Sequence, residues 1–375
     1  MFDFPVTEVN VWCPTYCLIM YLFILLNNYH IGIGNAYTNY INTNNKKGVI
    51  IIVGIFIITH CLQGDFFAMM RAVHNYSAIP GAYNYGEPFY QSLGLFLEKN
   101  YILFRTVVFG SAFGLFCLTA RRMGIPIYYA VIFLLASYIM IFSYARATLA
   151  MAVYFFGLSF LCKPLKGYKF IGYIIGIGLI LLSRYFHNSA IIMMMMTLAI
   201  LVPTNKKIFI LLLISTPILL SSFSNYFYTI LDSGEMGEDI TAKLNTYNDL
   251  ERDALGISGY MINTLQFLSF YIPLALTSKC IFKHKFKVEK DVLLMYKVMI
   301  GLLYISVLFY FLGSTFFVYV YRVLFMTMIP IVLVASKLHQ KGYMDKKTFL
   351  WCIKPGITFM TINYIYSVYC IIVST

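Results

Sequence analysis

Two arginines of this sequence stand inside or beside long apolar runs, where an ionised group is costly. Arg146 lies in "IFSYARATLAMAVYFF", between two apolar runs with almost no linker, and Arg322 lies about two turns into another run. A cation at the centre of a membrane helix costs about 3 kcal/mol on insertion scales, so such groups usually face a partner or a cavity. Both arginines are therefore candidates for binding phosphate or carboxylate. The alternatives are an interfacial side chain for Arg146 and a structural ion pair for Arg322.

A third arginine precedes a histidine and an amide in the stretch "SRYFHNSAII" (183–192). Arg184 and His187 share one face if the helix continues through them. A guanidinium beside an imidazole favours the neutral ring, which can accept a proton in catalysis. The alternative is a polar helix cap, in which Asn188 or Ser189 opens the next helix. The two roles are compatible.

Carboxylates and tyrosines gather in a segment before these runs. Asp65 follows a glycine at the end of an apolar run, and Glu87 lies in "YGEPFY" between Tyr85 and Tyr90. Sugar C–H faces pack on aromatic rings, and sugar hydroxyls need acceptors, so this composition suits a glycan. Tyrosines are also common at membrane interfaces, and either carboxylate could instead pair with a nearby arginine.

Composition identifies the elements that must position these residues. Of 375 residues, 60% are hydrophobic and 11% charged, whereas soluble proteins keep about a quarter charged. The apolar runs are continuous rather than alternating, which excludes barrel strands, and most are long enough to cross a bilayer as helices. The sequence predicts an all-α polytopic membrane protein, one integral membrane domain over 1–375, with about twelve transmembrane helices. The expected spans are 11–28, 48–63, 101–120, 125–144, 147–162, 168–183, 188–203, 208–228, 259–279, 292–312, 315–336 and 350–373.

Basic residues alternate between the two sides of these spans. Lysine-rich links mark the cytoplasmic side, so both termini and two longer loops, 64–100 and 229–258, are expected outside. The second loop is acidic, and the outer cations are mostly arginine. The cytoplasmic set comprises Lys46, Lys47, Arg121, Arg122, Lys163, Lys166, Lys169, Lys206, Lys207, Lys279, Lys283, Lys285, Lys287, Lys290, Lys337, Lys341, Lys346 and Lys347.

Several partner classes are disfavoured by these patterns. The net charge of +13 reflects cytoplasmic lysine acting as a topology signal, so no nucleic-acid partner is predicted. The eight cysteines show no CxxC or other metal-ligand spacing, and they are interpreted as small core residues. We therefore predict neither a metal nor a cofactor.

The order of the motifs resembles a known family. "GDFFAMM" (64–70), "NYGEPFYQSL" (84–93), "YARATLAMA" (144–152), "SRYFHNSAII" (183–192) and "YVYRVLF" (319–325) follow one another along the chain. This succession is similar to that of the EpsG-like family of exopolysaccharide and O-antigen polymerases, the Wzy type, over about residues 60–335. Two departures are a missing tyrosine shortly after Asp65, and Ala147 where members often have a polar residue.

The resemblance implies a GT-C-like membrane glycosyltransferase. Members move a glycan from undecaprenyl pyrophosphate onto the non-reducing end of an incoming lipid-linked repeat unit, at the outer face of the cytoplasmic membrane. A chain-length regulator is a candidate partner. The expected pyrophosphate ligands are Arg146, Arg184 and Arg322; the expected base is His187, Glu87 or Asp65; the expected substrate contacts are Tyr85, Tyr90 and Asn188.

Two other functions remain as alternatives. An O-antigen ligase uses the same donor with a lipid A-core acceptor and also employs outer arginine and histidine. A flippase or transporter would place charges along a path at mid-membrane and show repeats between its halves. In this sequence the charges gather towards one face and no repeat is visible, which favours the polymerase.

Overall fold

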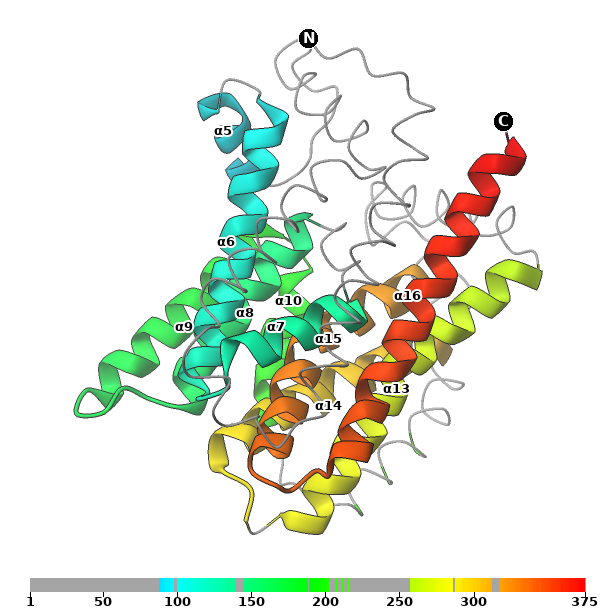
Figure 1. Ribbon diagram of the computed structural model, residues 1–375. Helices are drawn as coiled ribbons and strands as arrows, with labels where there is room; N and C mark the ends of the chain where they lie inside the picture. Colours follow the sequence, from blue (N-terminus) through cyan, green and yellow to red (C-terminus); the bar gives the residue numbers. More distant parts are fainter. Residues whose placement is uncertain are drawn as a thin grey trace.

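The computed structural model describes residues 88–97, 100–138, 145–187, 189–201, 207, 211, 215, 257–285, 287–311 and 317–374. Its elements within these ranges are helices, and no strand occurs among them (Figure 1). The elements are α5 (Pro88–Phe96), α6 (Tyr101–Arg122), α7 (Ile127–Tyr138), α8 (Ala145–Cys162), α9 (Lys169–Phe186), α10 (Ala190–Thr197), the 3-10 helix η2 (Leu198–Leu201), α13 (Ile257–His284), α14 (Lys290–Phe311), α15 (Phe317–Gln340) and α16 (Lys346–Ser374).

The all-helical class predicted from composition is confirmed for these residues. Each expected span between 101 and 203 and between 259 and 373 contains a helix, with ends that shift by a few residues. The expected spans 11–28, 48–63 and most of 208–228 lie outside the described residues, as do most of the loops 64–100 and 229–258. Within the first loop, residues Pro88–Phe96 form α5. The count of twelve spans stays a prediction.

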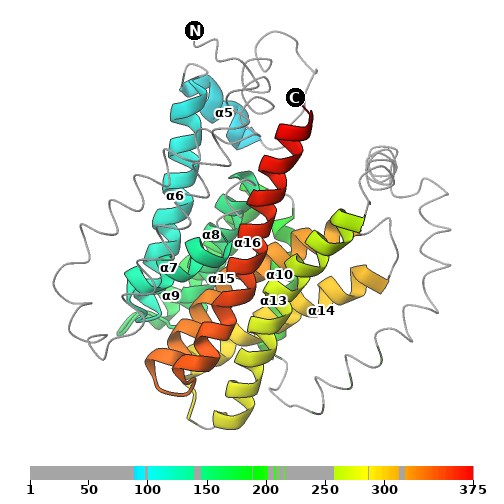
Figure 2. The ribbon, with the colours of Figure 1, turned by 45° about the vertical axis from the view of Figure 1, so that its right-hand side comes forward.

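The described helices pack against one another in one bundle. Helix α8 lies between α6 and α9, α14 packs along α15, and α13 packs along α16. Figure 2 shows α16 running beside α13 and across α7. Helix α7 contacts α6, α15 and α16, so it connects a helix from the beginning of the described chain with the two at its end. Among the described residues, three segments are long and apolar enough to cross a membrane: Lys169–Phe186, Leu265–His284 and Val323–Gln340.

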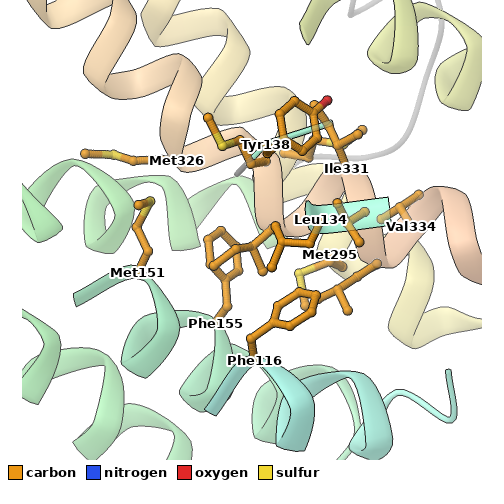
Figure 3. Packing of buried hydrophobic residues seen from close by; sticks show 14 of the residues in the cluster. Phe116, Leu134, Tyr138, Met151, Phe155, Met295, Met326, Ile331 and Val334 are labelled. Carbon is orange, nitrogen blue, oxygen red and sulfur yellow. The ribbon is translucent and has the colours of Figure 1, made fainter. Parts of the chain in front are cut away.

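The centre of the bundle is filled by side chains from many helices. Phe116, Leu134, Phe155, Met295 and Ile331 come from α6, α7, α8, α14 and α15, and all are buried in one cluster (Figure 3). Segments far apart in the sequence therefore share a single apolar core. This core fixes the directions of the helices whose ends carry the candidate site residues.

Helix α15 is largely buried inside the protein, whereas helix α9 is largely exposed. In α15, 89% of the apolar span is buried inside the protein, against 22% in α9. The side of α9 that faces away from the other helices exposes large apolar side chains, among them Phe170, Ile174 and Leu181. An apolar helix that the protein covers so little is suited to contact with lipid.

Small residues attach α9 to its neighbour. The buried side of α9 consists of Gly172, Gly176, Ile180 and Ser183. A Cβ added at Gly176 would lie 2.9 Å from the carbonyl oxygen of Gly157 in α8. The two backbones thus pass in direct contact, as in membrane helix pairs that use small residues four apart.

One end of the bundle gathers the lysine-rich links, seen on the lower side of Figure 1. Arg122 at the end of α6 donates from Nε to Oγ of Ser159 at 3.1 Å and from Nη2 to the carbonyl of Lys163 at 2.6 Å. Its guanidinium also lies over the ring of Phe160, 3.6 Å from the centroid. The α6–α7 link is thereby joined to the α8–α9 link.

A buried lysine makes further contacts at the same end of the bundle. Lys337 of α15 donates to the carbonyl of Met123 at 2.9 Å and lies 3.4 Å from a carboxylate oxygen of Glu289. Glu289 also pairs with Lys341. These contacts connect the α6–α7, α13–α14 and α15–α16 links, so basic residues of these three links, which their alternation assigned to one side, meet at one end of the bundle.

Glu289 neutralises part of this basic end, and replacing it is expected to lower stability. The hydrogen bond from Lys341, followed by the nearby charge of Lys337, holds the pKa of Glu289 below its usual value of 4.5. Because the folded-state pKa is depressed, the stabilisation is present above pH 4.5 and is lost as the pH falls through the folded value. At neutral pH we expect E289Q to cost less than about 1 kcal/mol, since the pair is partly exposed.

The measurement is thermal unfolding in detergent at several pH values. The difference between wild type and E289Q should shrink below pH 4.5. A double-mutant cycle with K341Q isolates the pair. Additive effects of the two substitutions, or a difference that grows on acidification, would contradict the assignment.

Candidate functional site

The three candidate pyrophosphate arginines belong to the bundle end opposite the basic links. Arg146 is the second residue of α8, which runs from there towards the Lys163 link, and Arg184 lies in the last turn of α9, which starts at Lys169. Arg322 lies near the start of α15, which ends beyond Lys337. The side chains of Arg146 and Arg322 lie outside the described residues, so their predicted convergence on one anion stays a prediction.

Arg184 is held at the exposed end of α9. It occupies the last turn of the helix, where carbonyl groups without helical partners concentrate partial negative charge and favour a cation. Its side chain is exposed. The guanidinium is therefore accessible to an anionic ligand, while the neighbouring Ser183 is buried against the protein.

His187 lies just past the end of α9 in extended conformation, with φ −163° and ψ 133°. The helix therefore does not continue through it, and the shared face expected for Arg184 and His187 does not form. Nδ1 of His187 accepts a hydrogen bond from the backbone amide of Ser189 at 3.0 Å, and Oγ of Ser189 lies 2.5 Å from the same nitrogen.

This contact makes the imidazole a helix cap. Helix α10 begins at Ala190, and Ser189 makes no side-chain cap bond to it. The backbone amide of the N-cap residue, Ser189, instead donates to Nδ1 of His187, so one amide without a helical partner at this helix start is satisfied. The sequence predicted that Asn188 or Ser189 opens the next helix, and Ser189 is the N-cap residue of α10, although its side chain makes no hydrogen bond to the helix. Asn188 itself lies outside the described residues.

Phe89, from the motif "YGEPFY", packs directly beside this turn. The Phe89 ring of α5 meets the Phe186 ring edge to face, with centroids 4.7 Å apart, and the Tyr185 ring at 6.0 Å. Proline at the first position of α5 suits a helix start because its missing amide has no helical partner there. Residues about 100 positions apart in the sequence, from two of the quoted motifs, are thus brought into contact.

Tyr90 lies deeper at the same junction. Its ring is 2% exposed and packs against Phe89 and Phe104, with centroids 5.1 and 6.1 Å away. In this conformation the side chain anchors α5 to α6. Its contact with substrate stays a prediction.

The remaining candidates, Asp65, Tyr85 and Glu87, lie outside the described residues. Glu87 precedes Pro88 in the chain, and His187 follows Phe186. Phe89 and Phe186 are in ring contact, so the start of α5 lies beside the residue that precedes His187. In the parts of the chain that the structure describes, no group of His, Cys, Asp or Glu side chains could hold a metal ion.

Lys297 and the aromatic pair Tyr185 and Phe186 were not singled out by the sequence analysis. Lys297 lies inside an apolar span of α14 and donates to the carbonyl of Ile200 at 2.8 Å, where it satisfies the end of η2. A lone lysine within an apolar run is a signal that could have identified it. The aromatic pair is typical of a membrane interface, so composition alone does not distinguish it.

Comparison with known families decides the assignment. The EpsG family model matches residues 65–373. The chain belongs to the EpsG family. The match includes all the helices described above, and it confirms the resemblance inferred from the order of the motifs. No curated protein matches the chain, and no solved structure does. Membership in the EpsG family makes this chain a membrane protein of polysaccharide biosynthesis.

Proposed function

We propose that this EpsG-family protein is a polysaccharide polymerase. It transfers a glycan from undecaprenyl pyrophosphate to the non-reducing-end hydroxyl of an incoming lipid-linked repeat unit. The bond between the anomeric carbon and the pyrophosphate oxygen breaks, and a glycosidic bond to the acceptor oxygen forms. The acceptor proton passes to a base, and the pyrophosphate leaves with the bonding electrons.

The observation that carries the proposal is the α5–α9 junction. Ring contacts of Phe89 with Tyr185 and Phe186 join the start of α5 to the end of α9, where Arg184 and His187 lie. The imidazole of His187 and the exposed guanidinium of Arg184 thus lie near the start of α5, which directly follows the predicted base Glu87 in the sequence. Holding donor and acceptor in one place makes the transfer effectively unimolecular.

The leaving group explains the arginines. Departure of a lipid pyrophosphate builds negative charge at the membrane interface, and guanidinium forks stabilise it by charge and paired hydrogen bonds. Arg184, with Arg146 and Arg322 at the same bundle end, is assigned this task. Asp65 and Glu87 are assigned the sugar hydroxyls and the acceptor proton, with Tyr85, Tyr90 and Asn188 as further substrate contacts.

The lysine-rich end of the bundle supports an orientation with those links in the cytoplasm. The reaction then takes place at the outer face of the cytoplasmic membrane, in a GT-C-like fold of about twelve spans. A chain-length regulator is the proposed partner. A ligase would need a lipid A-core acceptor, and no described contact favours that acceptor over a second repeat unit.

Reconstitution tests the proposal. Purified protein in liposomes, given undecaprenyl-pyrophosphate-linked repeat units and no nucleotide sugar, should produce a ladder of longer lipid-linked glycans. Transfer that occurs only when lipid A-core is added would identify a ligase. Movement of unchanged substrate across the bilayer, with no new glycosidic bond, would identify a transporter.

A further inference from the structure

Two lysine ammonium groups lie beside the turn that ends α6, residues 120–125 (the Gly124 turn). Backbone hydrogen bonds of 3.0 and 2.9 Å close this turn, and Gly124 has a φ of +68°, a conformation that glycine adopts readily. A Cβ added at Gly124 would lie 3.2 Å from Nζ of Lys337 and 4.0 Å from Nζ of Lys163. A cation from α15 and a cation from the α8–α9 link are thus held against one glycine, which is itself exposed.

The two ammonium groups differ in their partners. Lys337 is buried, and its ammonium group already meets the carbonyl of Met123 and a carboxylate oxygen of Glu289. Lys163 is exposed, and no carboxylate of the described residues lies within 4.0 Å of its ammonium group. Its backbone is fixed, because Arg122 donates to its carbonyl at 2.6 Å. Lys163 is therefore a held cation without a counterion among the described side chains.

Cations outnumber carboxylates around the Gly124 turn. Glu289 is shared between Lys337 and Lys341, and the second carboxylate near Lys341 is Asp291, whose Oδ1 already accepts a backbone amide. Positive charges this close repel one another, and the more so away from bulk water. An anion beside Lys163 would relieve this repulsion, so the turn is complementary to negative charge.

Large apolar side chains are exposed on the two helices next to this turn. Leu118 lies one turn before Arg122 in α6 and is 46% exposed. Phe170 and Ile174, near the start of α9, are 76% and 54% exposed. A soluble anion would neutralise the lysines but would not cover these side chains. A phospholipid does both, because its phosphate and its acyl chains belong to one molecule.

We propose that the Gly124 turn binds the phosphate of an anionic phospholipid, whose acyl chains lie along the exposed faces of α6 and α9. Lys163 supplies the charge that the phosphate pairs with, and Lys337 adds to the positive field from beneath the turn. Basic pockets between membrane helices on the lysine-rich side are known to suit such head groups. The site lies at the bundle end opposite Arg184, so it is separate from the proposed transfer site.

Thermal unfolding of the full chain in neutral detergent measures this binding, because a ligand of the folded protein raises its melting temperature. Phosphatidylglycerol should raise the melting temperature of wild type, and phosphatidylcholine at the same concentration should not. K163Q removes one charge, while the carbonyl of residue 163 still accepts from Arg122. We expect K163Q to need about fivefold more phosphatidylglycerol for the same rise, as for one lysine near a head group.

Lys354 offers a matched control on another helix. It is exposed on α16, and its Nζ lies 5.0 Å from the centroid of the Trp351 ring, so K354Q changes the net charge equally outside the Gly124 turn. K354Q and the charge-conserving K163R should respond as wild type does. Equal losses in K163Q and K354Q would reduce the effect to net charge and overturn the site, as would a wild type that phosphatidylglycerol does not stabilise. An equal rise with inorganic phosphate or a glutamate-rich peptide would overturn it in favour of a soluble occupant.

Native mass spectrometry counts the bound lipid directly. After incubation with phosphatidylglycerol, wild type and K354Q should each retain more bound phospholipid than K163Q does. Equal amounts on all three proteins would contradict the site. Neither measurement requires glycan transfer, so a failure of the lipid site and a failure of the polymerase proposal are distinguishable.

Discussion

Replacing Arg184 by alanine is expected to slow glycan elongation by about 100-fold, while the protein still folds. Loss of one preorganised donor to a developing negative charge commonly costs two to three orders of magnitude. Arg184 is exposed at the end of α9, so its removal opens no cavity in the core. The effect should appear in the rate of transfer with saturating lipid-linked donor, because the pyrophosphate charge grows as the glycosidic bond breaks.

Two variants make this prediction specific. R184K keeps the positive charge but loses the planar fork, so it should fall between wild type and R184A. K169A removes a cation from the opposite end of the same helix and should leave elongation unchanged. Equal rates for R184A and wild type in reconstituted liposomes would exclude Arg184 from the pyrophosphate site.

The helices were the most predictable part of this protein. Continuous apolar runs cannot satisfy their backbone groups in lipid except as helices, which is why spans such as 101–120 and 350–373 reappear as α6 and α16. The alternation of lysine-rich links also predicted which helix ends meet. What it did not predict are the contacts that join these ends, such as Lys337 with Met123, because they pair residues far apart in the chain.

The candidate site was predictable in residue type rather than in arrangement. Charge beside apolar runs identified Arg184 and His187, since such groups are rarely placed there without a partner or a ligand. The helix was expected to continue through His187, yet it ends at Phe186 and the imidazole caps the next helix. Periodicity does not specify the conformation of a one-turn link, because local side-chain acceptors compete there with the helix.

The contact between the rings of Phe89 and Phe186 could not be predicted from sequence patterns either. Phe89 and Phe186 lie in separate apolar contexts, and either ring could have faced lipid. Their edge-to-face contact depends on α9 being held against α8, which brings the end of α9 back to α5. The site thus depends on packing about two turns away from its own residues.

The substitution of Gly176 by alanine is expected to destabilise the contact between α8 and α9. Its new Cβ would lie 2.9 Å from the carbonyl oxygen of Gly157 and 3.0 Å from Cδ2 of Leu161. The leucine can rotate, but the backbone carbonyl cannot move without displacing α8. Overpacking of this kind costs about 1–3 kcal/mol, which we expect as a lower melting temperature in detergent.

Gly178 provides a matched control on the same helix. A Cβ added there meets nothing within 4 Å, and alanine favours a helix over glycine by about 1 kcal/mol. G178A should therefore be neutral or stabilising, so the same chemical change two residues apart has opposite effects. Equal melting temperatures for G176A and G178A would show that α8 and α9 do not pack through these glycines.

The G176A variant also tests whether the packing of α9 against α8 positions the residues of the candidate site. Arg184 follows Gly176 along α9, so a helix pushed away from α8 carries the guanidinium and the His187 turn with it. A misplacement of about 1 Å can cost 100-fold in rate. We therefore expect G176A protein that remains folded at low temperature to elongate glycans slowly, whereas G178A protein keeps the wild-type rate. A folded G176A protein with full activity would mean that the α8–α9 contact supports the fold but does not position the site.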